Sequence, residues 1–310
     1  MLEAYLGQAQ HHEHLTIFPI LVEEDRSLPH VLLQEALKAG DLSIKEKGSG
    51  TVPLLKAKNK SPHPILILDG EQLIGARQNR ITSRSIVLPP KSTTEIPVSC
   101  MEQGRWNFSG RDFSPAAHHA PSKVRRHARH VEASSPRASH RDLASAQGAV
   151  WDEIRSFGSK LGGRSPTEAL DAVFDHHQDD LEQWIEAFPA LDLQVGILAF
   201  SGTEPLGLDA LGAPSLYASV HRRLLTGYVL DALESRGGAA PRPPQEAGLS
   251  FIDRVQDAPR VPAEPLGSGE YRVLKETVLG GELVEGDDLL HLSAFPLDVQ
   301  TGRNGNGRDG

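Results

Sequence analysis

The chain has 310 residues, of which 38% are hydrophobic and 24% charged, and its formal net charge is −9. This composition is typical of a globular protein rather than a disordered one, and the acidic balance argues against nucleic acid as a partner. The single cysteine, Cys100, excludes an internal disulfide framework and fits a reducing compartment.

The N-terminal stretch MLEAYLGQAQHHEHL has neither the basic start nor the apolar core of a signal peptide. Further along, no apolar run reaches the roughly 18–20 residues that a membrane helix needs. We therefore expect a cytoplasmic protein that makes no membrane contact.

Residues 1–110 are expected to form a β-rich module, either a sandwich or a roll. The strand candidates are bounded by Gly, Pro or Asn, as strands commonly are; they are HLTIFPILVE, LSIKEKG, VPLLKAKN, PILILDGEQL, SIVLPP and TEIPVSCME. A short helix, LLQEALKAG, is expected to end at Gly40. Residues 65–68 are continuously apolar, which predicts a strand buried on both faces.

A change of composition follows this module. Residues 105–145 contain eight Lys or Arg, three Asp or Glu and five His. With its Pro, Ser and Ala content, this stretch predicts an exposed flap or linker over residues 111–145. As an alternative, its positive charge could contact phosphate groups or a partner protein.

Residues 146–297 are expected to form an α/β part, so that the whole chain is α+β. Ser165 and Glu168 frame a capping box with Pro166 in the first turn, which predicts a helix from there to Pro189. Two strands, LQVGILAF and LGLDAL, should follow, and then a second helix opened by Pro214. Residues 298–310, rich in Gly and polar side chains, are expected to be disordered.

Two stretches carry the candidate chemistry, LDGEQLIGARQNR and IPVSCMEQGRWNF. The chain has no GxxxxGK[ST] phosphate loop, GxSxG elbow, HExxH or CxxC motif. In an extended strand Cys100 and Glu102 share one face, and the carboxylate raises the thiol pKa. A nearby Arg80 or Arg105 would lower it again. The alternative is a buried cysteine beside a local ion pair of Glu102 with Arg105.

Carboxylates and donors also gather at the end of the apolar strand. Asp69 and Glu71 share a face if the strand continues past Gly70, and such a pair can share a proton or hold Mg²⁺ or Ca²⁺; the alternative is a simple Asp-Gly turn. Gln78, Asn79 and Arg80 could read a base, a ribose or a phosphate, or only hold loop backbone. His291 lies inside an apolar strand, as a core histidine or as a base.

Residues 50–106 resemble the ARG-and-rhodanese-phosphatase-superfamily-associated protein domain, and a weaker likeness extends over residues 14–297. The resemblance is carried by short motifs, namely Gly70-Glu71, Gly75, Gln78-Asn79-Arg80, Pro89-Pro90 and Cys100-Met101-Glu102-Gln103-Gly104-Arg105-Trp106. Gln147, Val150-Trp151 and His291-Leu292 are similar as well. Ala76 departs from the family pattern, which has a second glycine or small residue there. The family name implies a link to ADP-ribose or phosphorylated-nucleotide metabolism and to partner enzymes.

We therefore expect a pocket for an ADP-ribose-like or phosphorylated nucleotide ligand, with a hydrolase reaction if the chain is an enzyme. Glu71, Glu102 and Cys100 are the expected catalytic residues. The expected ligand-binding residues are Gln78, Asn79, Arg80, Arg105 and Trp106. No metal site and no cofactor follow from the sequence. The alternative function is a non-catalytic binding or scaffold protein that acts with a partner enzyme.

Overall fold

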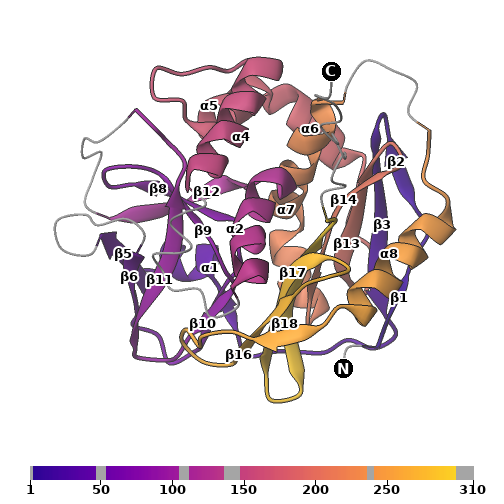
Figure 1. Cartoon of the computed structure of the whole chain (residues 1–310). Helices are drawn as coiled ribbons and strands as arrows, with labels where there is room; N and C mark the ends of the chain where they lie inside the picture. The colour runs from indigo at the N-terminus through magenta and orange to yellow at the C-terminus, as the bar shows by residue number, and fades with distance from the viewer. Residues whose placement is uncertain (1–2, 47–53, 105–111, 136–146, 236–240, 298–310) are drawn as a thin grey trace, which may run out of the picture.

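The structure is a computed structural model that describes residues 3–46, 54–104, 112–135, 147–235 and 241–297. Two large sheets lie on either side of a group of helices (Figure 1). Helix α7 (Pro214–Leu233) contacts strands of both sheets and lies at the centre of the molecule. Because it packs on both sides, fourteen of its twenty residues are buried.

The larger sheet has nine strands in the order β1-β3-β13-β14-β18-β17-β16-β15, with β2 paired to β3. Its strands are β1 (Ala4–Leu6), β2 (Gln10–His12), β3 (Leu15–Val22), β13 (Gln194–Ser201), β14 (Glu204–Leu211), β15 (Arg260–Pro262), β16 (Glu270–Leu274), β17 (Leu279–Glu285) and β18 (Asp288–Phe295). All pairs are antiparallel. Since β3 pairs with β13, strands from both sides of the expected boundary at residue 110 belong to one sheet.

The second sheet has six strands in the order β12-β8-β9-β11-β6-β5, and a small sheet has the order β10-β7-β4. The strands are β4 (Val31–Leu32), β5 (Leu42–Glu46), β6 (Leu54–Asn59), β7 (Ile65–Ile67), β8 (Glu71–Gly75), β9 (Arg80–Thr82), β10 (Ile86–Leu88), β11 (Thr93–Cys100) and β12 (Phe113–His119). Residues 65–68 are fully buried, as their apolar run predicted. The α+β class with a β-rich N-terminal part is confirmed.

The other described helices are α1 (Leu33–Lys38), α2 (Ser122–Ser134), α4 (Gln147–Lys160), α5 (Leu170–His176), α6 (Gln178–Glu186) and α8 (Gln245–Asp257). Helix α7 begins at Pro214, as predicted. Helix α8 covers the outer face of the large sheet, where Phe251 and Val255 join Phe18 and Leu208 in one hydrophobic cluster.

The prediction that a helix begins at Ser165 was wrong. Ser165 Oγ accepts a hydrogen bond from the Ala169 N–H at 2.9 Å, but this turn does not propagate, and α5 begins at Leu170. Glu168 adopts a left-handed φ of 49°, which ends the turn. The Thr167 carbonyl accepts the backbone N–H groups of Gln103 and Gly104, so it is bound outside any helix.

The exposed linker expected over residues 111–145 was also wrong in its described part. Residues 113–119 form β12, which pairs with β8, and residues 122–134 form α2. The arginines Arg125 and Arg129 of α2 are buried because acidic side chains pair with them inside the protein. Asp231 of α7 accepts the Ser122 N–H at 2.7 Å and thereby caps the start of α2.

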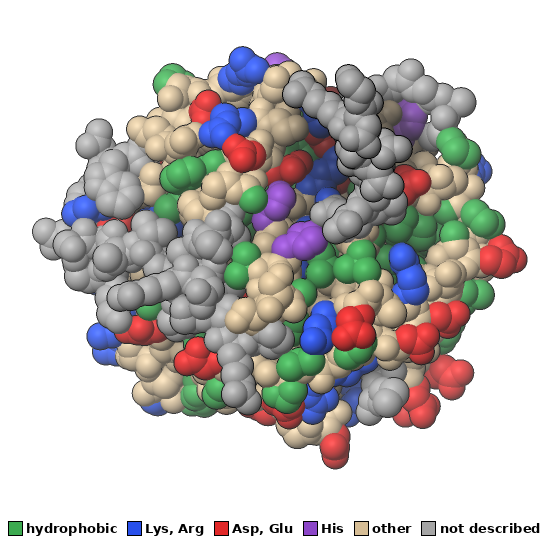
Figure 2. All heavy atoms as spheres, in the orientation of Figure 1, with side chains coloured by type: hydrophobic (Ala, Val, Ile, Leu, Met, Phe, Trp, Pro, Cys, Tyr) green, Lys and Arg blue, Asp and Glu red, His purple; other side chains and the backbone are tan. Residues whose placement is uncertain are grey.

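The surface is mixed in charge. Figure 2 shows acidic and basic side chains interspersed over the face in view. Among the helices that the structure describes, none is both long enough and apolar enough to cross a membrane. The tail expected to be disordered, residues 298–310, lies outside the described residues.

Candidate functional site

Five of the predicted site residues come together at one end of the six-stranded sheet. Gln78 Nε2 donates to the Glu102 carbonyl at 2.8 Å, and the Asn79 N–H donates to Glu102 Oε2 at 2.9 Å. Arg80 Nη1 donates to Gln78 Oε1 at 2.9 Å and also contacts Cys100 Sγ. All five side chains are buried, and the Asn79 side chain reaches out of this group to donate to Asp171 Oδ2 at 2.6 Å.

The environment of Cys100 makes it a weak nucleophile. Burial raises the pKa of its thiol to about 11, although Arg80 acts in the opposite direction. At neutral pH the group is therefore a thiol rather than the reactive thiolate. The catalytic roles of Cys100 and Glu102 stay predictions, and Arg105 and Trp106 lie outside the described residues.

Glu71 lies in a different part of the core. Its Oε1 pairs with Arg223 Nη1 of α7 at 2.9 Å, and its Oε2 accepts the Leu68 N–H at 3.3 Å. Burial raises the pKa of Glu71, against the lowering effect of Arg223. The predicted residues thus divide into two groups, with Glu71 apart from the group around Arg80.

A second network, not predicted as a unit, lies where the two sheets approach each other. Its centre is Arg125 of α2, whose Nη1 and Nη2 bind both oxygens of Asp209 at 2.8 and 2.6 Å. Arg125 Nη2 also binds Asp69 Oδ1 at 2.8 Å. All three residues are at most 3% exposed. A bidentate pair of this kind fixes the guanidinium in one orientation.

Local structure places each member of this network. Asp69 follows β7 in a turn that Gly70 makes with a φ of 82°, a conformation that favours glycine. A Cβ at Gly70 would lie 2.6 Å from both Arg125 and His119, so the turn packs directly on these side chains. Asp209 of β14 lies opposite Ser293 of β18, and His291 points to the same face of β18 because it is two residues away.

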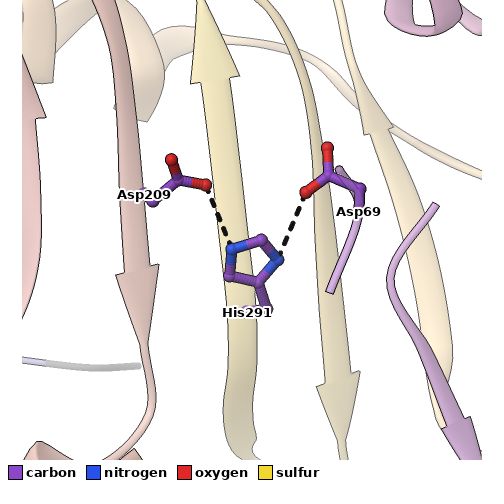
Figure 3. A group of neighbouring side chains, drawn as sticks. All are labelled: Asp69, Asp209 and His291. Carbon is purple, nitrogen blue, oxygen red and sulfur yellow. Dashed lines mark hydrogen bonds and ion pairs between the residues drawn. The ribbon is translucent and has the colours of Figure 1, made fainter. Parts of the chain in front are cut away.

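His291 lies between Asp69 and Asp209 (Figure 3) and connects this network to Ser85. Its Nε2 lies 3.2 Å from Asp209 Oδ1, and its Nδ1 lies 2.7 Å from Ser85 Oγ and 3.7 Å from Asp69 Oδ1. Ser85 Oγ already accepts the Asp69 N–H at 2.9 Å, so its own hydrogen is free to go to Nδ1. The imidazole then carries its hydrogen on Nε2 and donates it to Asp209. We call Ser85, His291 and Asp209 the relay.

The carboxylates of the network are held in the ionised form. Burial alone would raise the pKa of Asp209, but Arg125 and His291 hold it well below its ordinary value. The Tyr228 hydroxyl also donates to Asp209 Oδ2 at 2.6 Å. Asp69 has the same balance, with burial opposed by Arg125, and its pKa is lowered as well. An ionised Asp209 can therefore stabilise positive charge on His291.

Asp69, Asp209 and His291 could also offer ligands to a metal ion. One ligand atom from each lies within 4.8 Å of the others. Two carboxylates and an imidazole suit several divalent cations. However, the guanidinium of Arg125 already bridges both carboxylates and offsets one of their two negative charges. The donor set in this arrangement therefore fits an arginine-bridged network better than a metal centre.

His119 is the other buried imidazole beside the network. Neither of its ring nitrogens has a hydrogen-bond partner among the described residues, and the side chain is 2% exposed. Burial, helped by the positive charge of Arg125, lowers the pKa of His119 to about 3. The ring is therefore neutral at physiological pH.

A small cavity borders the network. Its volume is about 10 Å³, which corresponds to roughly one water molecule. Polar and apolar side chains from β9, β11, α2 and α4 line it together with the turn at Asp69; they are Asp69, Gly70, Ile81, Thr82, Ser83, Ser99, Val124, Arg125, Ala128 and Val150. Of the network, Asp69 and Arg125 reach this space.

Sequence reasoning named Asp69, as a pair with Glu71, and His291 by itself, but it missed Asp209, Ser85 and the role of Arg125. The available signal was an acidic residue inside the strand LGLDAL, which is the same pattern that drew attention to His291. A polar side chain in a buried strand requires a polar partner. Asp209 and His291 are two such positions in neighbouring strands, so the sequence could have suggested that they bind each other.

The comparisons with known proteins give one family. The model of the ARG and Rhodanese-Phosphatase-superfamily-associated Protein domain matches residues 3–295. No curated protein and no solved structure matches the chain. The match includes both groups of buried polar side chains and nearly all of the described fold. The chain therefore belongs to the ARG and Rhodanese-Phosphatase-superfamily-associated Protein domain family.

Proposed function

We propose that the chain is a hydrolase that acts on a phosphorylated, nucleotide-like ligand of the ADP-ribose type. The reacting groups would be those of the relay. His291 acts as the general base, Asp209 orients it and stabilises its protonated form, and Ser85 supplies the hydroxyl that it activates.

One observation carries this proposal, the unbroken series of hydrogen bonds from Ser85 through His291 to Asp209. In the proposed reaction the Ser85 oxygen bonds to the electrophilic carbon or phosphorus while its proton passes to His291 Nδ1. That proton leaves with the displaced group. Water then attacks the same centre by the reverse route and restores the Ser85 hydroxyl.

The charged groups around the relay balance one another and do not by themselves select a negatively charged ligand. Arg125, Arg129 and Arg84 are all buried near the relay and are held by Asp69, Asp209 and Glu132. Exclusion of water strengthens each of these interactions. The phosphorylated-nucleotide class itself comes from the family's association and is part of the proposal.

The test is hydrolysis of ADP-ribose, ADP and NAD by the purified chain, followed by chromatography of the products. Ser85→Ala and His291→Gln should each lower the rate by about 10³-fold or more, because either change interrupts the relay. Ser61→Ala is the matched control, since Ser61 is also a buried serine but its hydroxyl binds the backbone of His63 rather than a histidine ring. Equal rates for Ser85→Ala and the unmodified chain, or no hydrolysis of any of the three compounds, would refute the proposal.

A second candidate is a binding protein that acts with a partner enzyme. The family description favours it, because the domain is named for its association with other enzymes. The burial of the relay, with Ser85 3% and His291 1% exposed, also fits a structural network. A fluorophosphonate probe, which reacts with activated serines, separates the two candidates. Labelling at Ser85 favours the hydrolase, and the absence of labelling in correctly folded protein favours the binding protein.

A further inference from the structure

A groove lies between α4, α5 and the connection that joins them, on the part of the molecule drawn at the top of Figure 1. Its volume is about 180 Å³. Nine residues line it: Ile154, Arg155, Gly158, Gly163, Arg164, Ser165, Glu168, Ala169 and Val173. Unlike the cavity beside Asp69, it is large enough for part of an organic ligand.

The groove has one polar side and one apolar side. Arg155, Arg164, Ser165 and Glu168 supply the polar side, and with two arginines against one glutamate its lining has a net charge of +1. Ile154, Ala169 and Val173 supply the apolar side. This combination suits a ligand that carries an anionic group on a compact organic body.

The two arginines differ in their availability. Arg155 binds Gln103 Oε1 at 2.6 Å and also contacts Asp152, and its Nη1 lies 3.7 Å from Glu168 Oε2. Arg164 has one hydrogen bond, from Nη2 to Ser159 Oγ at 2.8 Å, and pairs with no carboxylate among the described residues. An arginine held by a neutral hydroxyl keeps its full charge for an incoming anion.

The groove also adjoins a motif that sequence reasoning singled out. Gln103 and Gly104 bind the Thr167 carbonyl through their backbone N–H groups, and Gln103 holds Arg155 through its side chain. A Cβ at Gly104 would lie 3.0 Å from Thr167 Cα, so the two segments are in close contact. The end of the Cys100–Gly104 stretch therefore positions one wall of the groove.

We propose that this groove binds the phosphate ester of a small sugar phosphate, with Arg164 and Arg155 on the phosphate and Ile154, Ala169 and Val173 against the sugar ring. Arginine suits this role because its planar donors match phosphate oxygens in pairs. The volume is below the roughly 300–1000 Å³ of pockets for drug-sized molecules, which favours a ligand of ribose phosphate size.

The inference deepens the proposed function and rests on it only for the identity of the sugar phosphate. Ile154 of the groove and Val150 of the cavity beside Asp69 lie one turn apart on α4. A nucleotide-like substrate bound in the groove by one phosphate would thus be held along the same helix that borders the network of Asp69 and Arg125.

Titration calorimetry of the full chain with ribose 5-phosphate tests the groove without any turnover. Arg164→Ala and Arg155→Ala should each weaken binding about tenfold or more, the loss expected for a charge-assisted contact to phosphate. Arg254→Ala is the matched control, because Arg254 is a partly exposed arginine on α8, far from α4 and α5 in Figure 1. It should change binding less than twofold.

The outcomes separate the groove from the proposed function. Binding that Arg164→Ala abolishes supports the groove even if the chain hydrolyses no nucleotide. No binding of ribose 5-phosphate, or equal binding by the Arg164→Ala and unmodified chains, would overturn it. Equal affinity for ribose 5-phosphate and inorganic phosphate would overturn the role assigned to the apolar side.

Discussion

At the scale of single residues, the chain holds an unusual number of charged side chains inside the protein. Arg80, Arg84, Arg125 and Arg129 are each at most 3% exposed, and each has an acidic or polar partner. Sequence alone located Arg80 but placed Arg125 in a solvated linker. The difference is that the partners of Arg125 lie 56 and 84 residues away, so no local pattern reports them.

The protonation of His119 should make the stability of the folded protein depend on pH. In the folded chain its pKa is about 3, against an ordinary value of 6.5, so the unfolded chain binds one more proton between these pH values. Stability should therefore fall as the pH drops below about 6.5, with a slope of about 1.4 kcal/mol per pH unit from this group. Free energies of unfolding from urea titrations between pH 7 and pH 5 measure the slope.

His119→Gln should reduce that slope by the contribution of one proton, because glutamine does not titrate. The matched control is His63→Gln, which replaces an exposed histidine. If both variants keep the full slope, the neutral buried state assigned to His119 is wrong.

At the scale of elements, sequence patterns found most strands and the helix opened by Pro214, because each pattern is local. They failed where a tertiary contact decided the backbone. Ser165 has all the features of a helix start, yet the Thr167 carbonyl binds the chain at Gln103 and Gly104 instead of continuing a helix. In α2, a composition typical of a linker forms a helix because Asp69, Asp209 and Glu132 neutralise its buried arginines.

The close contact between α7 and the chain at the end of β12 predicts how a substitution of Gly227 affects stability. A Cβ at Gly227 would lie 2.5 Å from the Ala120 carbonyl oxygen, closer than two such atoms can approach. Gly227→Ala should therefore destabilise the protein by about 1–3 kcal/mol, as overpacking does. Gly148 in α4 has nothing within 4 Å of its Cβ position, so Gly148→Ala should be neutral or stabilise by up to about 1 kcal/mol.

Urea unfolding of the two variants measures this difference directly. Both changes add the same methyl group to a glycine of a helix, and the gain in helix propensity is smaller at Gly148 because it lies in the first turn of α4. Equal effects would mean that α7 does not approach the Ala120 carbonyl as closely as the structure places it.

At the scale of the whole molecule, the nine-stranded sheet joins the two ends of the chain. β3, from the β-rich part, has β1 on one side and β13 on the other, and α7 packs against both large sheets. Sequence reasoning could give the class of each part but not this pairing, since strands that pair across 170 residues leave no periodic signal. A second cluster, which includes Ile44 and Ile96, lies within the first part, but the cluster of Leu15, Leu66 and Leu230 is shared by both parts.

We therefore expect the chain to unfold in one transition. Far-ultraviolet circular dichroism reports all elements, while in a Trp106→Phe background the fluorescence of Trp151 of α4 and Trp184 of α6 reports the second part. Phe18→Ala in β3 should lower both midpoints together, because it removes a fully buried ring worth about 3–5 kcal/mol. Two midpoints, or a Phe18→Ala effect absent from tryptophan fluorescence, would show that the parts unfold independently.

The place of β3 beside β13 also has a consequence for the newly made chain. Seven of its eight residues are buried in the finished protein, and its partner strand is roughly 170 residues further along. At about 5–20 residues per second, a ribosome needs on the order of 10–30 s to reach that partner. During this time an apolar strand is exposed with one edge open, which makes the nascent chain a candidate client for chaperones that bind apolar segments.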